Sequence, residues 1–389
     1  MPTFVAPGDA FEVSIGVHNN VDNSGAKAEI KLQLITSKHT EVIGTNIQTL
    51  EIAEKREGVA KFKIRANNVL GSGNFTFIAS MVGKQSKSSI DLSIRPPIPY
   101  MTIVKGGYLK KRGKAEISVE RKLYPHFRVL DTAASKVPIG LAHGLDVYLR
   151  NFPYSCTEQL VSQTVPAIVL RKHPEFGYDS KKSDAHFNRA VKILQSRQNA
   201  EGAFGFWAAN SHVSSFQTVY TLHFLLEAQD AGYPVPQTLL SRGRLYLRTL
   251  ASEKVESLSQ ARIAAYAIYV LTRYQEVTTQ YADTLCNWLT KNDKTGWEKD
   301  VTGIYLAAVY QMHRLNRKAE NLISHSRLGD PQKADYNSFY DGLLRDAVYL
   351  YIASRYFPER IGKIRGDELI NIATPVLEGR FNTTSAAFV

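Results

Sequence analysis

The sequence predicts a multidomain β + α fold in which a β part precedes an α part. Three observations support this prediction. Residues 11–94 alternate between apolar and polar, a proline-rich stretch follows at 95–99, and from about residue 141 apolar residues recur every three or four positions. Alternation predicts strands with one buried face, and the longer spacing predicts amphipathic helices. With 389 residues, of which 44% are hydrophobic, the chain is long enough for two or three domains.

Strands are expected in the first part wherever alternating segments are separated by turn residues. The alternating segments cover residues 11–17, 28–35, 59–66, 75–82 and 89–94, and turns are expected at 19–25, at 67–73 and at Gly83. Short strands at this spacing predict an N-terminal antiparallel β-sandwich over residues 1–95. Prolines at 96, 97 and 99 end it, because proline has no amide hydrogen to continue a central strand.

Residues 96–130 are expected to hold a short β segment. Two strand candidates, 100–104 and 115–120, flank a basic, glycine-rich loop at 105–113. Two strands cannot bury a core alone, so this segment is expected to be one part of a larger β domain.

Helices are expected through the rest of the chain. The periodic segments cover residues 185–198, 213–231, 237–250, 260–274, 281–289, 304–315, 343–356 and 366–377, and a short helix is expected after Asn382 or Thr383. Because so short a terminal helix is marginal alone, the chain is expected to be an internal piece of a longer protein. Periodicity does not distinguish a closed helical ring from a helical solenoid.

Charge and hydropathy argue against two classes of partner. The net charge is +12 and the isoelectric point is near 9.4, but the basic residues are scattered and their densest runs, 105–114 and 181–182, lack an aromatic platform. A nucleic-acid partner is therefore not expected. Direct membrane insertion is not expected either, because no apolar stretch is long enough and the start lacks a signal region.

Cys156 and Gln159 form the motif that carries chemistry. A cysteine thiol and a glutamine carboxamide separated by two residues can lose ammonia and close an internal thioester, which holds an acyl group ready for a nucleophile. The chain has one other cysteine, Cys286, and a disulfide between the two is the alternative use of Cys156.

The residues around this motif resemble a known family. Residues 152–159, Phe-Pro-Tyr-Ser-Cys-Thr-Glu-Gln, are similar to the thioester segment of bacterial alpha-2-macroglobulins. Residues 3–9, 194–207 and 231–236 also resemble segments of that family. The resemblance implies a macroglobulin-like sandwich at 1–95 and the first part of an interrupted small β (CUB-like) domain at 96–130. It further implies an α/α-toroid thioester domain at 131–389, truncated at its C-terminus.

The resemblance also implies a function, that of a fragment of a broad-spectrum protease inhibitor. In such a protein a protease cuts a bait segment, the molecule rearranges, and the acyl group of Gln159 captures amines of the target protease while Cys156 leaves as a thiol. The trap works once, so it is not a turnover enzyme, and it needs no cofactor and no metal. The family further implies a periplasmic location, with the full-length parent tethered to the inner membrane by a lipid.

Roles for the residues beside the motif follow from the same resemblance and from the need to keep a thioester dry. Phe152, Pro153 and Tyr154 precede the cysteine, and the two aromatic side chains are the expected shields. Glu158 is expected to be structural or a capping group. Some complement proteins of the wider family use a histidine to relay the acyl group. None of His186, His212 and His223 is identified as the counterpart of that histidine.

Three other functions remain open at this point. The segment could be a structural or partner-binding fragment whose thioester never forms. It could instead be an α/α-toroid enzyme, such as a glycan-active enzyme, for which Asp283 and Cys286 give one pair of metal ligands. Nucleic-acid binding through the positive charge ranks below both.

Overall fold

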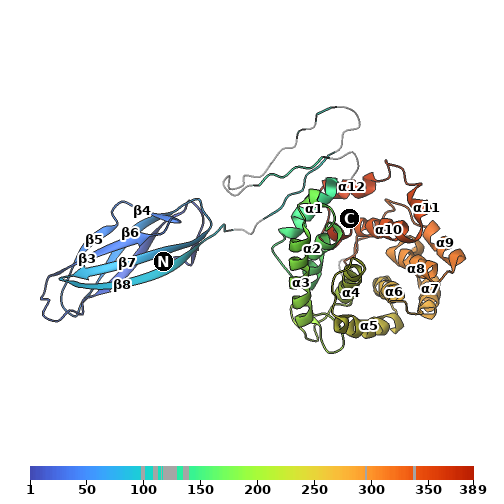
Figure 1. Cartoon of the computed structure of the whole chain (residues 1–389), viewed down its shortest axis with the longest axis horizontal. Coiled ribbons are helices and arrows are strands. Elements are labelled where there is room, and N and C mark those ends of the chain that lie inside the picture. The colour runs from blue at the N-terminus through green and yellow to red at the C-terminus, as the bar shows by residue number, and fades with distance from the viewer. Residues whose placement is uncertain are drawn as a thin grey trace. The chain divides into compact units, whose positions relative to one another are not determined.

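The computed structural model describes residues 1–97, 101–107, 113–114, 116, 129–134, 140–293, 296–335 and 339–389. The chain divides into two compact units, one built of strands and one built of helices (Figure 1). Each unit has a hydrophobic core of its own.

Two sheets make up the β unit. One has the strand order β1 (Phe4–Val5), β8 (Lys84–Ile94), β7 (Gly71–Met81), β3 (Ala28–Thr36) and β5 (Ile47–Ile52), and the other has the order β2 (Ala10–His18), β6 (Glu57–Ala66) and β4 (Thr40–Ile43). Neighbouring strands are antiparallel except β1 and β8, which are parallel.

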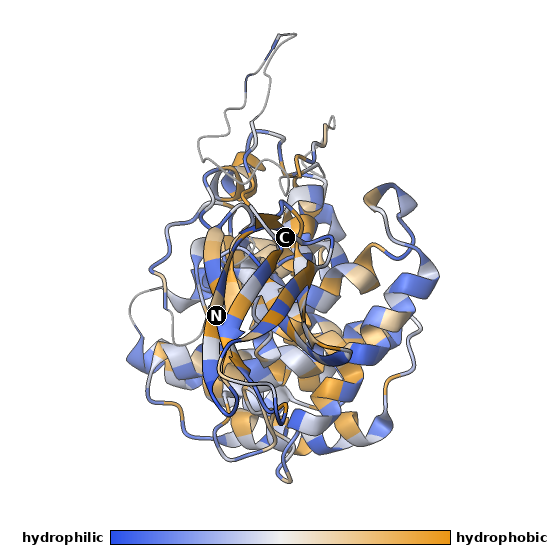
Figure 2. Ribbon diagram, turned by 90° about the vertical axis from the view of Figure 1, so that its left-hand side faces the viewer, coloured by the Kyte–Doolittle hydropathy of each residue, from blue (hydrophilic) through white to orange (hydrophobic). Residues whose placement is uncertain are grey.

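The pleat of each strand sends alternate side chains into the space between the two sheets. In β6 the side chains of Phe62 and Ile64 are buried, whereas those of Lys61 and Lys63 face solvent. Figure 2 shows this pattern as alternating orange and blue bands along the strands. Phe62 meets Phe77 of the other sheet with 6.1 Å between ring centroids, so the unit is a β-sandwich with a filled core.

Several details of the β unit differ from the sequence predictions. Strands β1, β4 and β5 were not predicted, and β1 and β4 are too short to show alternation. Gly71 and Gly73, expected in a turn, lie in β7. Val82, expected in a strand, forms the β7–β8 turn with Gly83, where both residues have positive φ values of 40° and 71°.

The expected short β segment is not a pair of strands in the part of it that the structure describes. Residues 101–104 form no strand, and Val104 packs instead against Gly144 of the first helix, where an added Cβ would lie 2.9 Å from Val104 Cγ1. Most of the candidate strand 115–120 lies outside the described residues, so that prediction is not tested.

The helical unit is an α/α toroid. Its helices are α1 (Gly140–Arg150), α2 (Thr157–Val169), α3 (Ser180–Arg197), α4 (Ser215–Asp230), α5 (Gln237–Ser252), α6 (Leu258–Arg273), α7 (Thr279–Asn292), α8 (Val301–Met312), α9 (Asn316–Ser324), α10 (Gly342–Tyr356), α11 (Pro358–Ile361), α12 (Ile370–Leu377) and α13 (Thr383–Phe388). Helices α2, α4, α6, α8 and α10 form an inner ring, and α3, α5, α7, α9 and α11 lie outside it (Figure 1). Helix α13 packs against both α10 and α2, so it closes the inner ring.

Burial explains which helices are inside. Nearly every residue of α4 and α8 is buried, whereas α5 buries only one face, formed by residues such as Leu240 and Leu247. The eight predicted helices correspond to α3–α8, α10 and α12, and the short helix predicted after residue 382 is α13. The prediction for α12 began four residues too early, because turns precede Ile370. No described helix is both long and apolar enough to cross a membrane.

Candidate functional site

Cys156 and Gln159 lie together at the first turn of the inner helix α2. Cys156 is the N-cap residue, with an extended backbone at φ −60° and ψ 170°. The Gln159 side chain folds back so that its Oε1 accepts a hydrogen bond from the Cys156 backbone N–H at 3.0 Å. The sulfur of Cys156 in turn faces the backbone N–H of Gln159. The thiol and the carboxamide therefore share one helical turn.

The environment of Cys156 is neither open nor fully closed. The residue is partly buried, and burial raises the pKa of its thiol, while the Gln159 N–H acts in the opposite direction. At neutral pH the free thiol is therefore protonated. A protonated thiol is a poor nucleophile, so this sulfur does not have the character of a catalytic thiolate.

Thr157 fixes the start of α2 to a loop from the next part of the chain. Its backbone N–H donates to the carbonyl of Phe206 at 3.0 Å, and its Oγ1 donates to the carbonyl of Gly205 at 2.6 Å. Gly205 has no room for a side chain, because an added Cβ would lie 2.0 Å from the carbonyl oxygen of Ala208. The loop at 201–207 therefore holds the first turn of α2 from one side.

Arg197, at the end of α3, supports the same contact. Arg197 is 7% exposed, and its Nη1 lies 3.3 Å from Thr157 Oγ1. The guanidinium carbon lies 5.6 Å from the ring centroid of the exposed Trp207. Neither Arg197 nor Thr157 was predicted as a site residue. The segment that contains Arg197 stood out in the sequence only by its resemblance.

Glu158 is buried and binds hydroxyl groups. Its carboxylate accepts a hydrogen bond from Ser162 Oγ of its own helix at 2.8 Å, and from Thr384 Oγ1 at 2.7 Å. Thr383 Oγ1 lies 2.9 Å from both carboxylate oxygens. Glu158 is the second residue of α2 and does not cap this helix. Its threonine partners on α13 were not predicted from the sequence.

The residues expected to shield the motif differ in their exposure. Phe152 is half-buried and packs against Tyr148 of α1, with 5.5 Å between ring centroids. Tyr154 is 58% exposed and Pro153 is exposed. Gln163 Nε2 donates to the carbonyls of Phe152 and Tyr154 at 2.8 and 2.9 Å, which fixes this turn. Phe152 also packs against Tyr154, with 5.9 Å between ring centroids, so the two aromatic side chains expected as shields contact each other.

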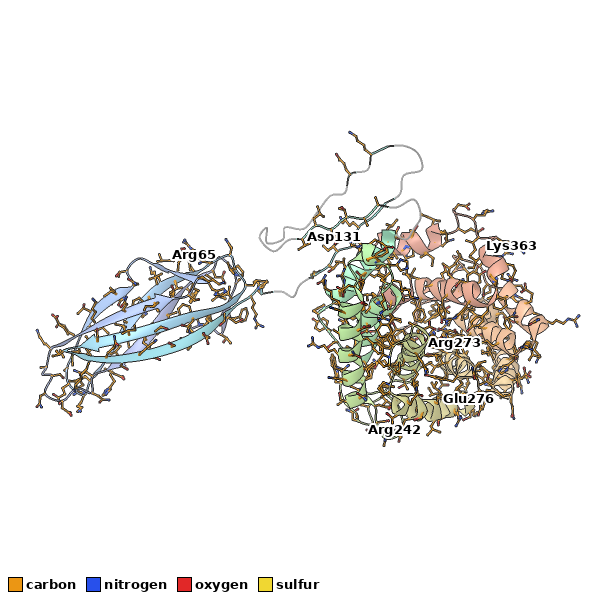
Figure 3. All side chains as sticks on the ribbon, in the orientation of Figure 1. Arg65, Asp131, Arg242, Arg273, Glu276 and Lys363 are labelled. Carbon is orange, nitrogen blue, oxygen red and sulfur yellow. The ribbon has the colours of Figure 1, made fainter. Side chains whose placement is uncertain are left out.

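The histidines have separate environments. His212 stacks on Phe206, whose carbonyl binds Thr157, with 5.3 Å between ring centroids. His223 is buried on α4 between the hydroxyls of Tyr266 and Tyr351, at 2.8 and 3.1 Å. That cluster continues to Arg273, which is labelled near the middle of the ring in Figure 3. His186 lies on the outer helix α3, and burial lowers its pKa.

The expected alternatives for the two cysteines lack structural support. Both cysteines are free. Asp283 Oδ1 already accepts hydrogen bonds from Tyr310 and Lys318, and Tyr310 also contacts Cys286 Sγ at 3.4 Å. Within the residues that the structure describes, no group of three His, Cys, Asp or Glu side chains is placed to hold a metal ion.

Comparisons with known proteins identify relatives along the whole chain. No family model matches the sequence. The chain is 32% identical to an alpha-2-macroglobulin homolog of Yersinia pestis and 32% identical to the alpha-2-macroglobulin of Rickettsia conorii. Both matches cover 100% of the chain but only 20% and 21% of those proteins. The chain therefore spans about a fifth of the length of these curated relatives.

Solved structures show the same fold. Native alpha-2-macroglobulin from Escherichia coli, in a structure that spans domain MG7 to the C-terminus, matches with a TM-score of 0.71 and 18% identity, over 100% of the chain and 63% of that structure. A reconstruction of the native conformation of the E. coli protein matches with a TM-score of 0.68 and 19% identity, over 100% of the chain and 25% of that protein. Along its whole length, the chain is thus similar by sequence and by fold to a segment of bacterial alpha-2-macroglobulins.

Proposed function

We propose that this chain is the part of a single-use protease trap that carries the reactive acyl group. The observation that carries the proposal is the first turn of α2, where the Gln159 carboxamide reaches back to the Cys156 backbone N–H and the Cys156 sulfur faces the Gln159 backbone N–H. In the bond that we propose, Sγ of Cys156 joins Cδ of Gln159, and the carboxamide nitrogen leaves as ammonia.

The proposed reaction needs only an amine as co-reactant. The amine nitrogen attacks Cδ of Gln159, the carbon–sulfur bond breaks, and its electron pair stays on sulfur. The nitrogen loses one proton and the sulfur ends as a thiol, so an amide replaces the thioester. An amide is much less reactive toward thiols than a thioester is toward amines, so the released thiol does not attack the new amide. The reaction therefore runs once.

The target that we propose is a protease. E. coli alpha-2-macroglobulin has a solved structure after activation by porcine elastase, and Salmonella alpha-2-macroglobulin has one after reaction with methylamine. Lysine side chains of a protease are amines of the same class as methylamine. The exposed Tyr154 and Trp207 lie beside the reactive turn, where an approaching protein meets them first.

The start of α2 also supports the shielding that a stored thioester requires. Water hydrolyses an exposed thioester, so the bond must stay dry until a rearrangement uncovers it. Phe152 packs on Tyr148, and the Thr157 hydroxyl closes the opposite side against Gly205. These contacts make the turn partly buried in the folded chain.

Thiol titration before and after methylamine tests the proposal. Fresh protein should show one accessible thiol from Cys286 at most, and methylamine should release one further thiol that peptide mapping assigns to Cys156. Cys286→Ser is the matched control, because it removes the other cysteine and should leave the released thiol unchanged. A fully titrating Cys156 in fresh protein would contradict the proposal.

A further inference from the structure

Residues 381–388, which we name the closing segment, contact the reactive turn of α2 although more than two hundred residues separate them. The closing segment consists of Phe381, Asn382 and helix α13, and α13 packs between α10 and α2. It is therefore the element that joins the last inner helix of the ring to the first. Its side-chain hydrogen bonds to α2 go to Glu158, in the turn that carries Cys156 and Gln159.

The first of these contacts is polar. Glu158 lies between Cys156 and Gln159, is 2% exposed, and takes hydrogen bonds from Thr383 and Thr384 at 2.7 to 2.9 Å. Both threonines are buried, as is Ser162, the third donor. A buried carboxylate loses its hydration, so each of these hydroxyls replaces water that Glu158 cannot reach. Moving α13 away would leave the Glu158 carboxylate with one hydroxyl donor, Ser162, of the three.

The second contact is aromatic. Phe381 packs edge-on against Tyr148, with 5.0 Å between ring centroids, and Tyr148 packs edge-on against Phe152 at 5.5 Å. Burial, followed by the charge of Glu158, raises the pKa of Tyr148 to about 12. Tyr148 thus lies within the electric field of Glu158 and touches both Phe152 and the closing segment.

The closing segment is itself anchored to the ring. Asn382 caps α13 by accepting a hydrogen bond from the Ser385 N–H at 2.9 Å, and its side-chain amide donates to Asp341 Oδ2 at 3.2 Å. Asp341 is the N-cap of α10 and accepts a hydrogen bond from the Leu344 N–H at 2.7 Å. One asparagine therefore connects α10, α13 and, through its neighbours, α2.

We propose that Thr383 and Thr384 are positioning residues for the reactive turn, and that the closing segment is a latch which holds this turn in its shielded form. The thioester part of this inference rests on the proposed function. Displacing the latch removes two donors from Glu158 and the support of Phe381 from Tyr148, so the start of α2 loosens and Phe152 loses its backing. The end of the ring thereby controls access to Cys156.

Hydrogen exchange of the α2 amides at 157–162 tests the latch without relying on the thioester. The variant Thr383→Val with Thr384→Val keeps the side-chain shape but removes both hydroxyls. We expect its α2 amides to exchange at least about tenfold faster than those of the unsubstituted chain. Thr383→Ser with Thr384→Ser keeps both hydroxyls and should stay within about threefold of it. If the double valine variant does not fold, Thr384→Val alone serves, because Thr384 makes the shortest of these bonds.

Thr272→Val is the control for loss of a buried inner-ring hydroxyl elsewhere. Thr272 Oγ1 lies 2.6 Å from Thr278 Oγ1 and is buried on α6. The latch would be overturned if the amides at 157–162 exchanged less than about threefold faster in the double valine variant than in the unsubstituted chain. It would also be overturned if Thr272→Val accelerated exchange of the same amides equally.

Thiol release then separates the latch from the thioester. Methylamine should release the Cys156 thiol about tenfold faster from the double valine variant than from the double serine variant. Equal rates would overturn control of reactivity by the closing segment. If the unsubstituted chain releases no thiol, the proposed function fails, while the exchange result still decides the positioning role.

Discussion

Two inner helices of this ring begin with nearly the same sequence pattern and end up with different surroundings. Helix α6 follows Ser257 and has Gln260 three residues later, and α2 follows Cys156 and has Gln159 three residues later. At α6, Ser257 Oγ accepts a hydrogen bond from the Gln260 N–H at 3.3 Å. The side-chain atom at the N-cap position is oxygen in α6 and sulfur in α2.

The oxygen of Ser257 suits helix capping, whereas the sulfur of Cys156 suits the thioester that we propose. Serine is a favoured N-cap and sulfur is a weak acceptor, so a cysteine at this position contributes less to the helix. Ser257 and Gln260 are exposed, whereas Cys156 and Gln159 are partly buried. The start of α2 is held instead by Thr157, Glu158 and their partners. The start of α2 thus combines a poor cap with hydrogen bonds to other parts of the ring.

The largest expected effect comes from making α2 resemble α6. Cys156→Ser should abolish thiol release by methylamine completely, because an ester or free hydroxyl cannot yield a thiol. Serine is a better cap than cysteine, so the melting temperature should not fall. Thiol titration and thermal unfolding measure both effects. Cys286 is the one cysteine left in this variant, so a thiol that still appeared on addition of methylamine would assign the chemistry to Cys286.

Removing the polar support of the reactive turn should cost stability. Thr157→Val deprives the Gly205 carbonyl of its donor and leaves Arg197 without that hydroxyl. We expect the free energy of unfolding to fall by about 1–3 kcal/mol in denaturant titrations. Ser259→Ala, at the middle of the α6 pattern, is the control and should change it by less than about 0.5 kcal/mol. Equal losses in both variants would contradict the special support of α2.

Removing the packed shield should raise reactivity more than removing the exposed one. Phe152→Ala should speed methylamine-dependent thiol release about tenfold, which corresponds to about 1.4 kcal/mol of barrier. Tyr154→Ala should change the rate by less than about twofold, because Tyr154 is already 58% exposed. The reverse order would make Tyr154 the shield.

Removing the Ser257 cap of α6 should have a smaller effect, on stability alone. Ser257→Ala should lower the free energy of unfolding by about 0.5–1 kcal/mol, because Ser257 satisfies one backbone N–H of α6. Thiol release should be unchanged. A change in its rate would mean that α6 is coupled to the reactive turn.

The smallest expected effect comes from making α6 resemble α2. Ser257→Cys recreates the Cys-x-x-Gln spacing at an exposed helix start, and we expect no thioester there. The added cysteine should titrate freely in fresh protein without methylamine. A second methylamine-released thiol at residue 257 would show that spacing alone is sufficient.

This comparison also shows what the sequence could predict. Alternation located strands β2, β3, β6, β7 and β8, and apolar spacing located most of the ring, because those patterns are local. The spacing of Cys156 and Gln159 is local as well, and the structure places both in one turn. Strands β4 and β5 were missed because they show no clear alternation over their short lengths.

The remaining parts of the site depend on contacts across the fold. Thr383 and Thr384 reach Glu158 from more than two hundred residues away, and no local pattern marks them. Arg197 and Gly205 approach Thr157 only because α3 and its loop fold back on α2. A single sequence shows the reactive pair, but the groups that position it become visible only in the folded ring.

Intact mass spectrometry of the fresh chain beside its Cys156→Ser variant decides whether the thioester forms. We expect the unsubstituted chain to be lighter than its sequence mass by one ammonia and the variant to show its full sequence mass. Methylamine should then add its own mass to the unsubstituted chain alone. A fresh chain at its full sequence mass, unchanged by methylamine, would show that no thioester is present.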